Sequence, residues 1–167
     1  DVVVKPLFGS EGRGITRVTD EAVAHRVFGT LAQLQAVLYL QEFIPHHGYD
    51  LRLLVIGSRV LGMKRCNARD WRTNVARGAT TEAFSPSDEM TAMALNAAAA
   101  VGAPIAGVDL LPGQDGRLYA LEVNAVPGWK ALATTLQVDV ARLVLDYLDS
   151  RLSGGTESTR SALAPRE

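Results

Sequence analysis

The sequence predicts an α+β fold with antiparallel sheets, and three observations support this prediction. Short apolar runs flank the turn segments Gly57-Ser58 and 112–116, which is the pattern of β-hairpins. Longer stretches with apolar residues at helical spacing separate these runs. The 167 residues are the size of one ordinary domain, and 47% apolar with 21% charged residues is typical of a globular protein with a buried core.

The N-terminal part predicts a hairpin, a helix and a strand. Residues 2–4 are a candidate buried strand, and residues 15–18 alternate apolar and polar, so the two are expected to pair around a glycine-rich loop. Thr19 or Asp20 can cap a helix that begins near Glu21. A second apolar run covers residues 36–44 and ends at Pro45, which predicts another strand.

The rest of the chain predicts two hairpins and two helices. Segments 51–56 and 59–64 flank Gly57, which suits the first position of a type II′ turn. Segments 106–111 and 118–123 form the second hairpin. A helix capped at Ser85, with Pro86 in its first turn, should run to about Val101. Residues 66–81 predict a long functional loop or a ragged strand, residues 138–152 a closing amphipathic helix, and residues 153–167 a disordered tail.

Composition excludes several classes of protein. The net charge of −1 provides no basic field for general binding of nucleic acid. The single cysteine, Cys66, excludes an intrachain disulfide and a cysteine-cluster metal site, and it fits a reducing compartment. No stretch approaches the roughly 18 apolar residues that span a bilayer, and no signal pattern opens the chain. We therefore expect a cytoplasmic protein without a membrane partner.

The hairpin around residues 112–116 carries two acids. If Asp115 and Gly116 are its two turn residues, Asp109 lies directly opposite Glu122, and Asn124 shares the face of Glu122 because side chains alternate along a strand. Two carboxylates about 5 Å apart repel each other unless one is protonated or a cation lies between them. An all-oxygen set of this kind suits Mg²⁺ or Mn²⁺. The alternative is that both acids simply face solvent beside a turn.

The glycine-rich loop follows a lysine. Lys5 ends a strand before Gly9, Gly12 and Gly14, an order that matches neither the P-loop nor the dinucleotide fingerprint. One interpretation is a hairpin lid, in which the lysine pairs with phosphate while the glycine backbone closes over it. An ordinary flexible turn is the other interpretation.

A group of basic residues follows the first of the two later hairpins. Lys64, Arg65, Arg72 and Arg77 are interspersed with Asn67, Trp71 and Asn74. Together with a metal site and a lysine lid, such a group would stabilise charge during phosphoryl transfer. The alternative is a solvated basic loop. We assign no catalysis to the histidines, and the two tryptophans either line a pocket or pack.

The order of these residues resembles that of ATP-grasp ligases of the RimK type, the α-L-glutamate ligases. The resemblance covers residues 2 to about 152. Residues 70–74 and 126–130 are more similar to the tetrahydromethanopterin:α-L-glutamate ligase branch than to the ribosomal-protein modifiers. The matching segments are Lys5-Pro6 with its glycine loop, Gln41-Glu42-Phe43-Ile44, Asp50-Leu51-Arg52, Met63-Lys64-Arg65, Arg72-Thr73-Asn74, Gly107-Val108-Asp109-Leu110-Leu111, and Glu122-Val123-Asn124 with Pro127-Gly128.

The resemblance implies a role for each matching residue. The residues implied to bind ATP are Lys5, Gly12 and Gly14 at the phosphates, Gln41, Glu42 and Phe43 at adenine, and Asp50 near ribose. Those implied to act at the nucleotide and phosphoryl site are Lys64, Arg72 and Asn74. The implied ligands of Mg²⁺ or Mn²⁺ are Asp109, Glu122 and Asn124, in agreement with the independent hairpin argument.

The resemblance also implies an ATP-grasp fold in two subdomains. Residues 1–40 would belong to a small lid subdomain that is truncated at its N-terminus. Residues 41–152 would form a larger antiparallel-sheet subdomain with packed helices and the metal site. The family's N-terminal domain and an upstream ATP-contacting lysine have no counterpart in the sequence. We therefore expect a C-terminal fragment that is inactive by itself.

The implied activity is ATP-dependent ligation of a carboxylate and an amine. ATP would convert the acceptor carboxylate into an acyl phosphate, and the amine of glutamate would displace phosphate, with release of ADP. The acceptor would be a small molecule such as a pterin cofactor, or a protein C-terminus, and the protein could be a homo-oligomer. The alternatives are a ligase that uses another amine, such as an amino acid or a peptide, and a nucleotide-binding interaction module that has lost catalysis.

Overall fold

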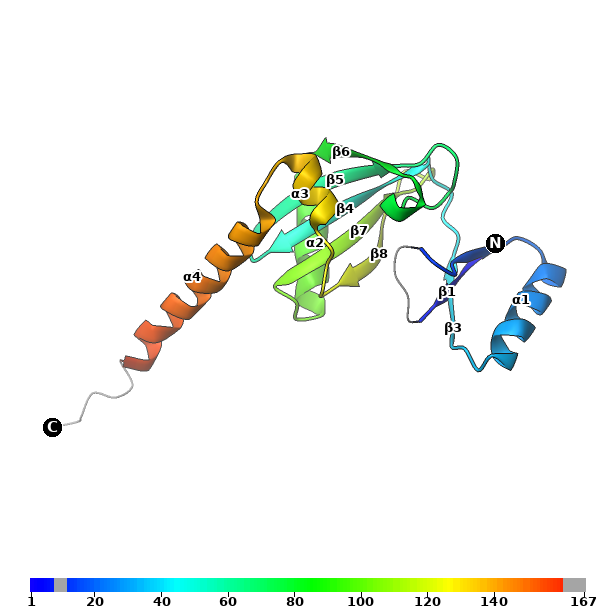
Figure 1. Cartoon of the computed structure of the whole chain (residues 1–167), viewed down its shortest axis with the longest axis horizontal. Coiled ribbons are helices and arrows are strands. Elements are labelled where there is room, and N and C mark those ends of the chain that lie inside the picture. Colours follow the sequence, from blue (N-terminus) through cyan, green and yellow to red (C-terminus); the bar gives the residue numbers. More distant parts are fainter. Residues whose placement is uncertain (8–11, 161–167) are drawn as a thin grey trace. The chain divides into compact units, whose positions relative to one another are not determined.

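The computed structural model (Figure 1) describes residues 1–7 and 12–160, with side chains as far as residue 153. Gly9 of the glycine loop and residues 161–167 of the predicted tail lie outside the described residues. The chain forms two compact units that interleave in sequence. The first contains Asp1–Asp50, Arg65–Thr80 and Leu111–Tyr119, and the second contains Leu51–Lys64, Thr81–Leu110 and Ala120–Glu167. The predicted subdomain boundary near residue 40 stays a prediction.

The N-terminal strands form a three-stranded antiparallel sheet. β1 (Val2–Pro6) pairs on one side with β2 (Thr16–Val18) and on the other with β3 (Leu38–Glu42), and Val3 lies opposite both Arg17 and Gln41. Val4 and Val18 are buried. The predicted hairpin of residues 2–4 with 15–18 is therefore confirmed.

Helix α1 (Glu21–Gln33) begins where the sequence predicts it. Asp20 is the N-cap, since its Oδ1 accepts a hydrogen bond from the backbone N–H of Val23 at 2.8 Å. A side-chain oxygen at this position satisfies one of the N–H groups that a helix start leaves without an intrahelical partner.

The later strands form a five-stranded sheet in the order β6-β5-β4-β7-β8. Their bounds are β4 (Tyr49–Ile56), β5 (Arg59–Cys66), β6 (Thr80–Phe84), β7 (Ile105–Pro112) and β8 (Leu118–Asn124). Between β4 and β5, Gly57 has φ +61°, as the predicted tight turn requires. The centre of the sheet pairs β4 with β7, two strands that are far apart in sequence, from Leu51 opposite Leu110 to Ile56 opposite Ile105.

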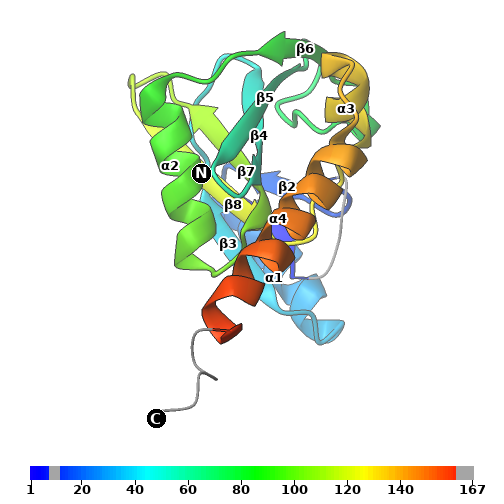
Figure 2. The ribbon, with the colours of Figure 1, turned by 90° about the vertical axis from the view of Figure 1, so that its left-hand side faces the viewer.

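Helices cover both faces of this sheet. Figure 2 shows α2 (Asp88–Ala100) on one side and α3 (Lys130–Leu136) with α4 (Val140–Arg160) on the other. On the α3 and α4 side, Leu54, Ile56 and Met63 pack with Leu132 and Val140. On α2 the buried residues are Ala94 and Ala98, whose small side chains let the helix lie close to the strands. No helix in the described part of the chain is long and apolar enough to cross a membrane.

Two helix boundaries differ from the expectations. Helix α2 is capped by Ser87, whose Oγ accepts from Met90 N–H at 3.3 Å, so the predicted cap at Ser85 is wrong by one half-turn. Pro86 then precedes the cap, where its missing N–H costs no helical hydrogen bond. Helix α4 continues to Arg160, whereas the sequence predicted its end at Leu152. Helix α3 was not predicted at all.

The turn between β7 and β8 also differs. The N–H of Gly113 donates to the carbonyl oxygen of Arg117 at 2.8 Å, and Gly116 N–H donates to Gly113 at 3.1 Å. Three residues therefore form the turn, and Gly116 takes the left-handed conformation that this turn needs, with φ +79°. The two-residue turn around Asp115 and Gly116 was wrong, and counting from it no longer places Asp109 opposite Glu122.

We predict that Gly62→Ala destabilises the protein. A Cβ at Gly62 in β5 would lie 2.6 Å from the carbonyl oxygen of Phe84 and 3.1 Å from Cδ of Pro86, so backbone must move. Overpacking of this kind costs about 1–3 kcal/mol. The matched control is Gly29→Ala, which meets nothing within 4 Å and should stabilise helix α1 by about 0.5–1 kcal/mol. Thermal melts that show equal stability for both variants would contradict the close packing of β5 on β6.

Candidate functional site

One arginine joins the two predicted metal-binding acids. Arg52 in β4 lies opposite Asp109 in β7, and the two side chains form an ion pair with one hydrogen bond. Arg52 Nε contacts Asp109 Oδ1, while Arg52 Nη2 donates to Asp109 Oδ2 at 2.8 Å. Both side chains are largely buried, with exposed fractions of 15% and 8%.

Glu122 approaches the same guanidinium. Its Oε1 lies 3.8 Å from Arg52 Nη2, and its side chain is half exposed. A cationic side chain, Arg52, thus lies near both acids, and the expectation of a metal ion between them stays a prediction. The sequence had indicated Arg52 only as part of a motif. An arginine inside an otherwise apolar strand was the signal that could have identified it.

Asn124 lies two residues after Glu122 in β8, so the two side chains share a face of that strand. Its Oδ1 accepts a hydrogen bond from Val126 N–H at 2.9 Å. No group of three or more acidic, histidine or cysteine side chains suited to a metal occurs among the described residues. Two carboxylates and one amide are nevertheless the oxygen donors that Mg²⁺ prefers, since this ion keeps several waters. The donor chemistry of Asp109, Glu122 and Asn124 thus fits a hard divalent ion.

Asp50, the predicted ribose contact, is held by Arg65. Arg65 Nε donates to Asp50 Oδ1 at 2.7 Å and Arg65 Nη2 donates to Oδ2, and both side chains are buried. A buried carboxylate needs such a partner because isolated burial of its charge is costly. The ribose contact stays a prediction, and Arg65 is the basic residue of β5 that the site assignment missed.

Lys64 precedes Arg65 in β5, so the two side chains point to opposite faces of the strand. Lys64 Nζ lies 3.7 Å from Glu82 Oε2 of β6, in an exposed ion pair. Such pairs contribute little stability. The catalytic role of Lys64 stays a prediction.

The basic segment after β5 is organised by Asn67. Its Nδ2 donates to the carbonyl oxygens of Arg72 at 2.8 Å and Arg77 at 3.4 Å, and its Oδ1 accepts from Arg69 N–H at 3.1 Å and Asp70 N–H at 3.2 Å. An amide offers two donors and two acceptor positions, and all four are used here. The side chain is buried, so the loop closes around it.

Arg72 is paired with Asp70. Arg72 Nη2 donates to Asp70 Oδ2 at 2.6 Å, Nε donates to both carboxylate oxygens at 3.1 Å, and Arg72 N–H donates to Oδ1 at 2.9 Å. The side-chain hydrogen bond lowers the pKa of Asp70 and raises the pKa of Arg72. Both groups are therefore charged at neutral pH, and the guanidinium has a fixed orientation.

The end of the glycine loop touches the same segment. Arg77 Nη2 donates to the carbonyl oxygen of Gly12 at 3.2 Å. A Cβ on Gly12 would lie 2.3 Å from Asn74 Oδ1, and Gly12 and Gly14 have φ +69° and +74°. Only glycine suits both the conformation and the close approach at Gly12. The structure thus brings Gly12, Asn74 and Arg77 together.

The remaining predicted nucleotide residues lie on the N-terminal sheet and just after it. Lys5 in β1 lies opposite Tyr39, and Gln41 lies opposite Val3, so Lys5 and Gln41 share one face of the sheet while Glu42 lies on the other. The backbone N–H of Phe43 donates to the carbonyl oxygen of Asp1 at 3.1 Å.

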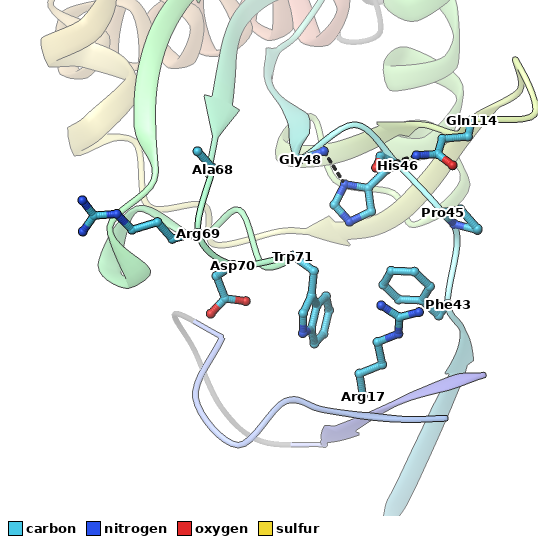
Figure 3. A pocket seen from close by; sticks show the side chains of 10 residues that line it. All are labelled: Arg17, Phe43, Pro45, His46, Gly48, Ala68, Arg69, Asp70, Trp71 and Gln114. Atoms are coloured by element: carbon cyan, nitrogen blue, oxygen red, sulfur yellow. Dashed lines mark hydrogen bonds between the residues drawn. The ribbon is translucent and has the colours of Figure 1, made fainter. Parts of the chain in front are cut away.

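A pocket of about 450 Å³ lies beside this segment (Figure 3). The ring of Phe43 contacts the rings of His46 and Trp71 there. His46 Nδ1 accepts from Gly48 N–H at 3.2 Å, and burial lowers the pKa of His46. The lining residues are Arg17, Phe43, Pro45, His46, Gly48, Ala68, Arg69, Asp70, Trp71 and Gln114.

The fold is similar to that of a solved ATP-grasp ligase. The ATP-grasp ligase PsnB complexed with minimal precursor matches the structure with a TM-score of 0.69 and 25% identity, over 91% of this chain and 48% of that chain. Residues 1–148 match the RimK-like ATP-grasp domain, and the chain belongs to this family. The predicted fold and family are confirmed.

Two curated relatives are similar in sequence. The tetrahydromethanopterin:alpha-L-glutamate ligase of Methanococcus maripaludis is 36% identical over 151 residues, which are 87% of this chain and 51% of the relative. A probable alpha-L-glutamate ligase of Sodalis glossinidius is 35% identical over 155 residues, 91% of this chain and 52% of the relative. The chain spans about half the length of these relatives.

We predict that Asn67→Ala loosens the loop that carries Arg72. The substitution leaves two carbonyl oxygens and two N–H groups without their partner, at a cost of about 1–3 kcal/mol. Hydrogen exchange of the amides of Arg69 and Asp70 should accelerate, because their acceptor is removed. Asn96→Ala on the exposed face of α2 is the matched control and should leave these amides unchanged. Unchanged exchange in the Asn67 variant would refute its role in shaping the loop.

Proposed function

We propose that the complete protein is an ATP-dependent carboxylate-amine ligase that adds glutamate to an acceptor carboxylate. The observation that carries the proposal is the pair of acids Asp109 and Glu122, which approach a single guanidinium in a domain of the RimK-like ATP-grasp family. Charged side chains that gather at the centre of a sheet suit a reaction that binds and transfers a phosphoryl group. The names of both relatives support glutamate as the amine.

The chemistry requires activation of the acceptor. A carboxylate does not accept an amine until one oxygen becomes a good leaving group, and phosphorylation by ATP provides it. The amine then attacks the acyl carbon, and phosphate leaves. Negative charge grows on the transferred phosphoryl group and on the tetrahedral intermediate, where fixed cations stabilise it. Arg72 would serve this role, with Lys64 and Asn74, because Asp70 already orients its guanidinium.

The nucleotide would be held by residues of the first unit. Lys5 and Gln41 share a face of the N-terminal sheet, which supports a common role toward one ligand. Gly12 and Gly14 would let backbone N–H groups approach phosphate. Glu42 and Phe43 would receive adenine, and Asp50 would lie near ribose.

A divalent ion would be held by Asp109, Glu122 and Asn124. Mg²⁺, or Mn²⁺ in its place, supplies positive charge against the phosphate oxygens when bound. Arg52 would hold the carboxylate of Asp109 in a fixed orientation, since its Nη2 donates to Asp109 Oδ2. The acceptor would be a small molecule or a peptide end, and we propose a cytoplasmic location, where ATP and glutamate are available.

The reaction products test this proposal. Full-length protein with ATP, Mg²⁺, glutamate and a panel of candidate acceptors should release ADP and phosphate in proportion to amide formation. AMP and pyrophosphate as products would refute the acyl-phosphate route. Saturable ATP binding without any turnover would instead favour a nucleotide-binding module, and a second amine used in preference to glutamate would replace the proposed donor.

We predict that Glu122→Gln abolishes most turnover while the fold survives. The half-exposed side chain contributes charge and not packing, so thermal stability should change by less than about 0.5 kcal/mol. Loss of a carboxylate from a hard-ion site should raise the Mg²⁺ concentration needed for half-maximal activity at least tenfold. Isothermal titration with Mg²⁺ provides a readout independent of activity. As a control, Glu89→Gln at the exposed start of α2 should behave like the wild type. Full activity of the Glu122 variant would refute the metal assignment.

A further inference from the structure

The pocket at Phe43 has walls that are suited to a flat ring. The ring of Phe43 meets the indole of Trp71 edge-on, with centroids 5.7 Å apart and planes at 81°, and it meets His46 at 5.9 Å. Figure 3 shows these side chains lining one hollow, with Arg17 beneath Phe43. Aromatic rings from two segments of chain converge there, in the tilted arrangements that aromatic pairs prefer.

The charged groups of this pocket favour a ligand that carries negative charge. The guanidinium of Arg17 lies 3.5 Å over the Phe43 ring, and Arg69 also lines the pocket. Arg17 is paired with Asp1, and Asp70 with Arg72. Three guanidiniums and two carboxylates thus belong to the pocket and its ion pairs, which leaves an excess of one positive charge.

His46 adds a neutral ring to the lining of the pocket. Because Nδ1 accepts the N–H of Gly48, the proton of the neutral ring is on Nε2. Burial lowers the pKa of His46, so the ring is neutral at pH 7. The pocket therefore offers aromatic side chains and guanidinium groups.

The position of Arg72 indicates which substrate the pocket receives. Arg72 follows Trp71 directly, and its Cζ lies 5.8 Å from the centre of the indole ring. In the proposed reaction Arg72 acts at the transferred phosphoryl group, whereas adenine is at the other end of ATP. A pocket that borders Arg72 is thus placed for the acceptor. The expected contact of Phe43 with adenine would then be made by its backbone, since its ring faces the pocket.

We propose that this pocket binds a flat, negatively charged aromatic or heteroaromatic group of the acceptor, close to the carboxylate that becomes activated. The inference rests on the proposed ligase function and names the chemical class of its acceptor. Glutamate has no ring and cannot use the three aromatic side chains.

Binding of a probe to the full-length protein tests this inference without ATP or metal. We would titrate 2-naphthoate and its saturated counterpart, decahydro-2-naphthoate, by isothermal calorimetry. The two probes share charge and skeleton, but only the first has a ring face that can stack. We expect 2-naphthoate to bind about fivefold to tenfold more tightly. Equal affinities would overturn ring recognition.

Variants and competitors complete the test. Trp71→Leu and Arg17→Met should each weaken 2-naphthoate binding about tenfold, while Trp71→Phe should retain it and shows that the ring matters. Arg26→Met on the exposed face of α1 is the matched control for Arg17→Met. Unchanged affinity in Trp71→Leu would overturn the site. Displacement of the probe by adenosine would reassign the pocket to the nucleotide, and displacement by glutamate would reassign it to the donor.

The outcome is separable from the ligase proposal. Probe binding requires no turnover, so absence of ADP formation would refute the proposed function and leave the binding result as measured. Conversely, glutamate-dependent ADP formation by a protein that binds both naphthoates equally would refute this inference alone.

Discussion

The ion pair between Arg52 and Asp109 is the constraint on which the centre of the sheet depends. β4 and β7 are apolar strands, and the neighbours Leu53 and Leu110 are fully buried. A lone carboxylate in such surroundings costs several kcal/mol, so the buried Asp109 needs a partner of opposite charge. Arg52 provides that cation from the adjacent strand, and Glu122 approaches the same group. This pairing offsets part of the cost of burying the acid inside the core.

Buried polar groups of the first unit also have partners within the chain. Asp50 and Arg65 neutralise each other where both are buried, and Asp70 holds Arg72 where both are partly exposed. Asn67 satisfies four backbone groups of one loop with a single neutral side chain. Polar groups that partner one another inside the protein keep a fixed geometry before a ligand arrives. The loop that carries Arg72 therefore has its shape before a ligand binds.

Local patterns predicted every described strand except β6, and most helices, because period-two alternation and turn residues act within a few positions. They failed where contacts with side chains from distant parts of the sequence determine the local structure. The segment 112–116 is compatible with two turns, and the three-residue turn is favoured by Asp115, which accepts hydrogen bonds from Arg117 N–H and the Tyr119 hydroxyl. Helix α3 has no side-chain cap, and burial of Leu132 in the core accounts for it.

The partners within the site could not be predicted for a related reason. Arg52 and Asp109 are 57 positions apart, and they meet only because β7 lies beside β4. No turn connects these two strands directly, so no local sequence pattern predicts that they are neighbours. The sequence nevertheless contained a usable signal. Arg52 and Asp109 are charged residues inside the predicted apolar strands 51–56 and 106–111, where an unpaired charge is not tolerated, so each was expected to need a partner of opposite charge. Asp50 and Arg65 lie just outside the predicted strands, and only the structure shows that they pair.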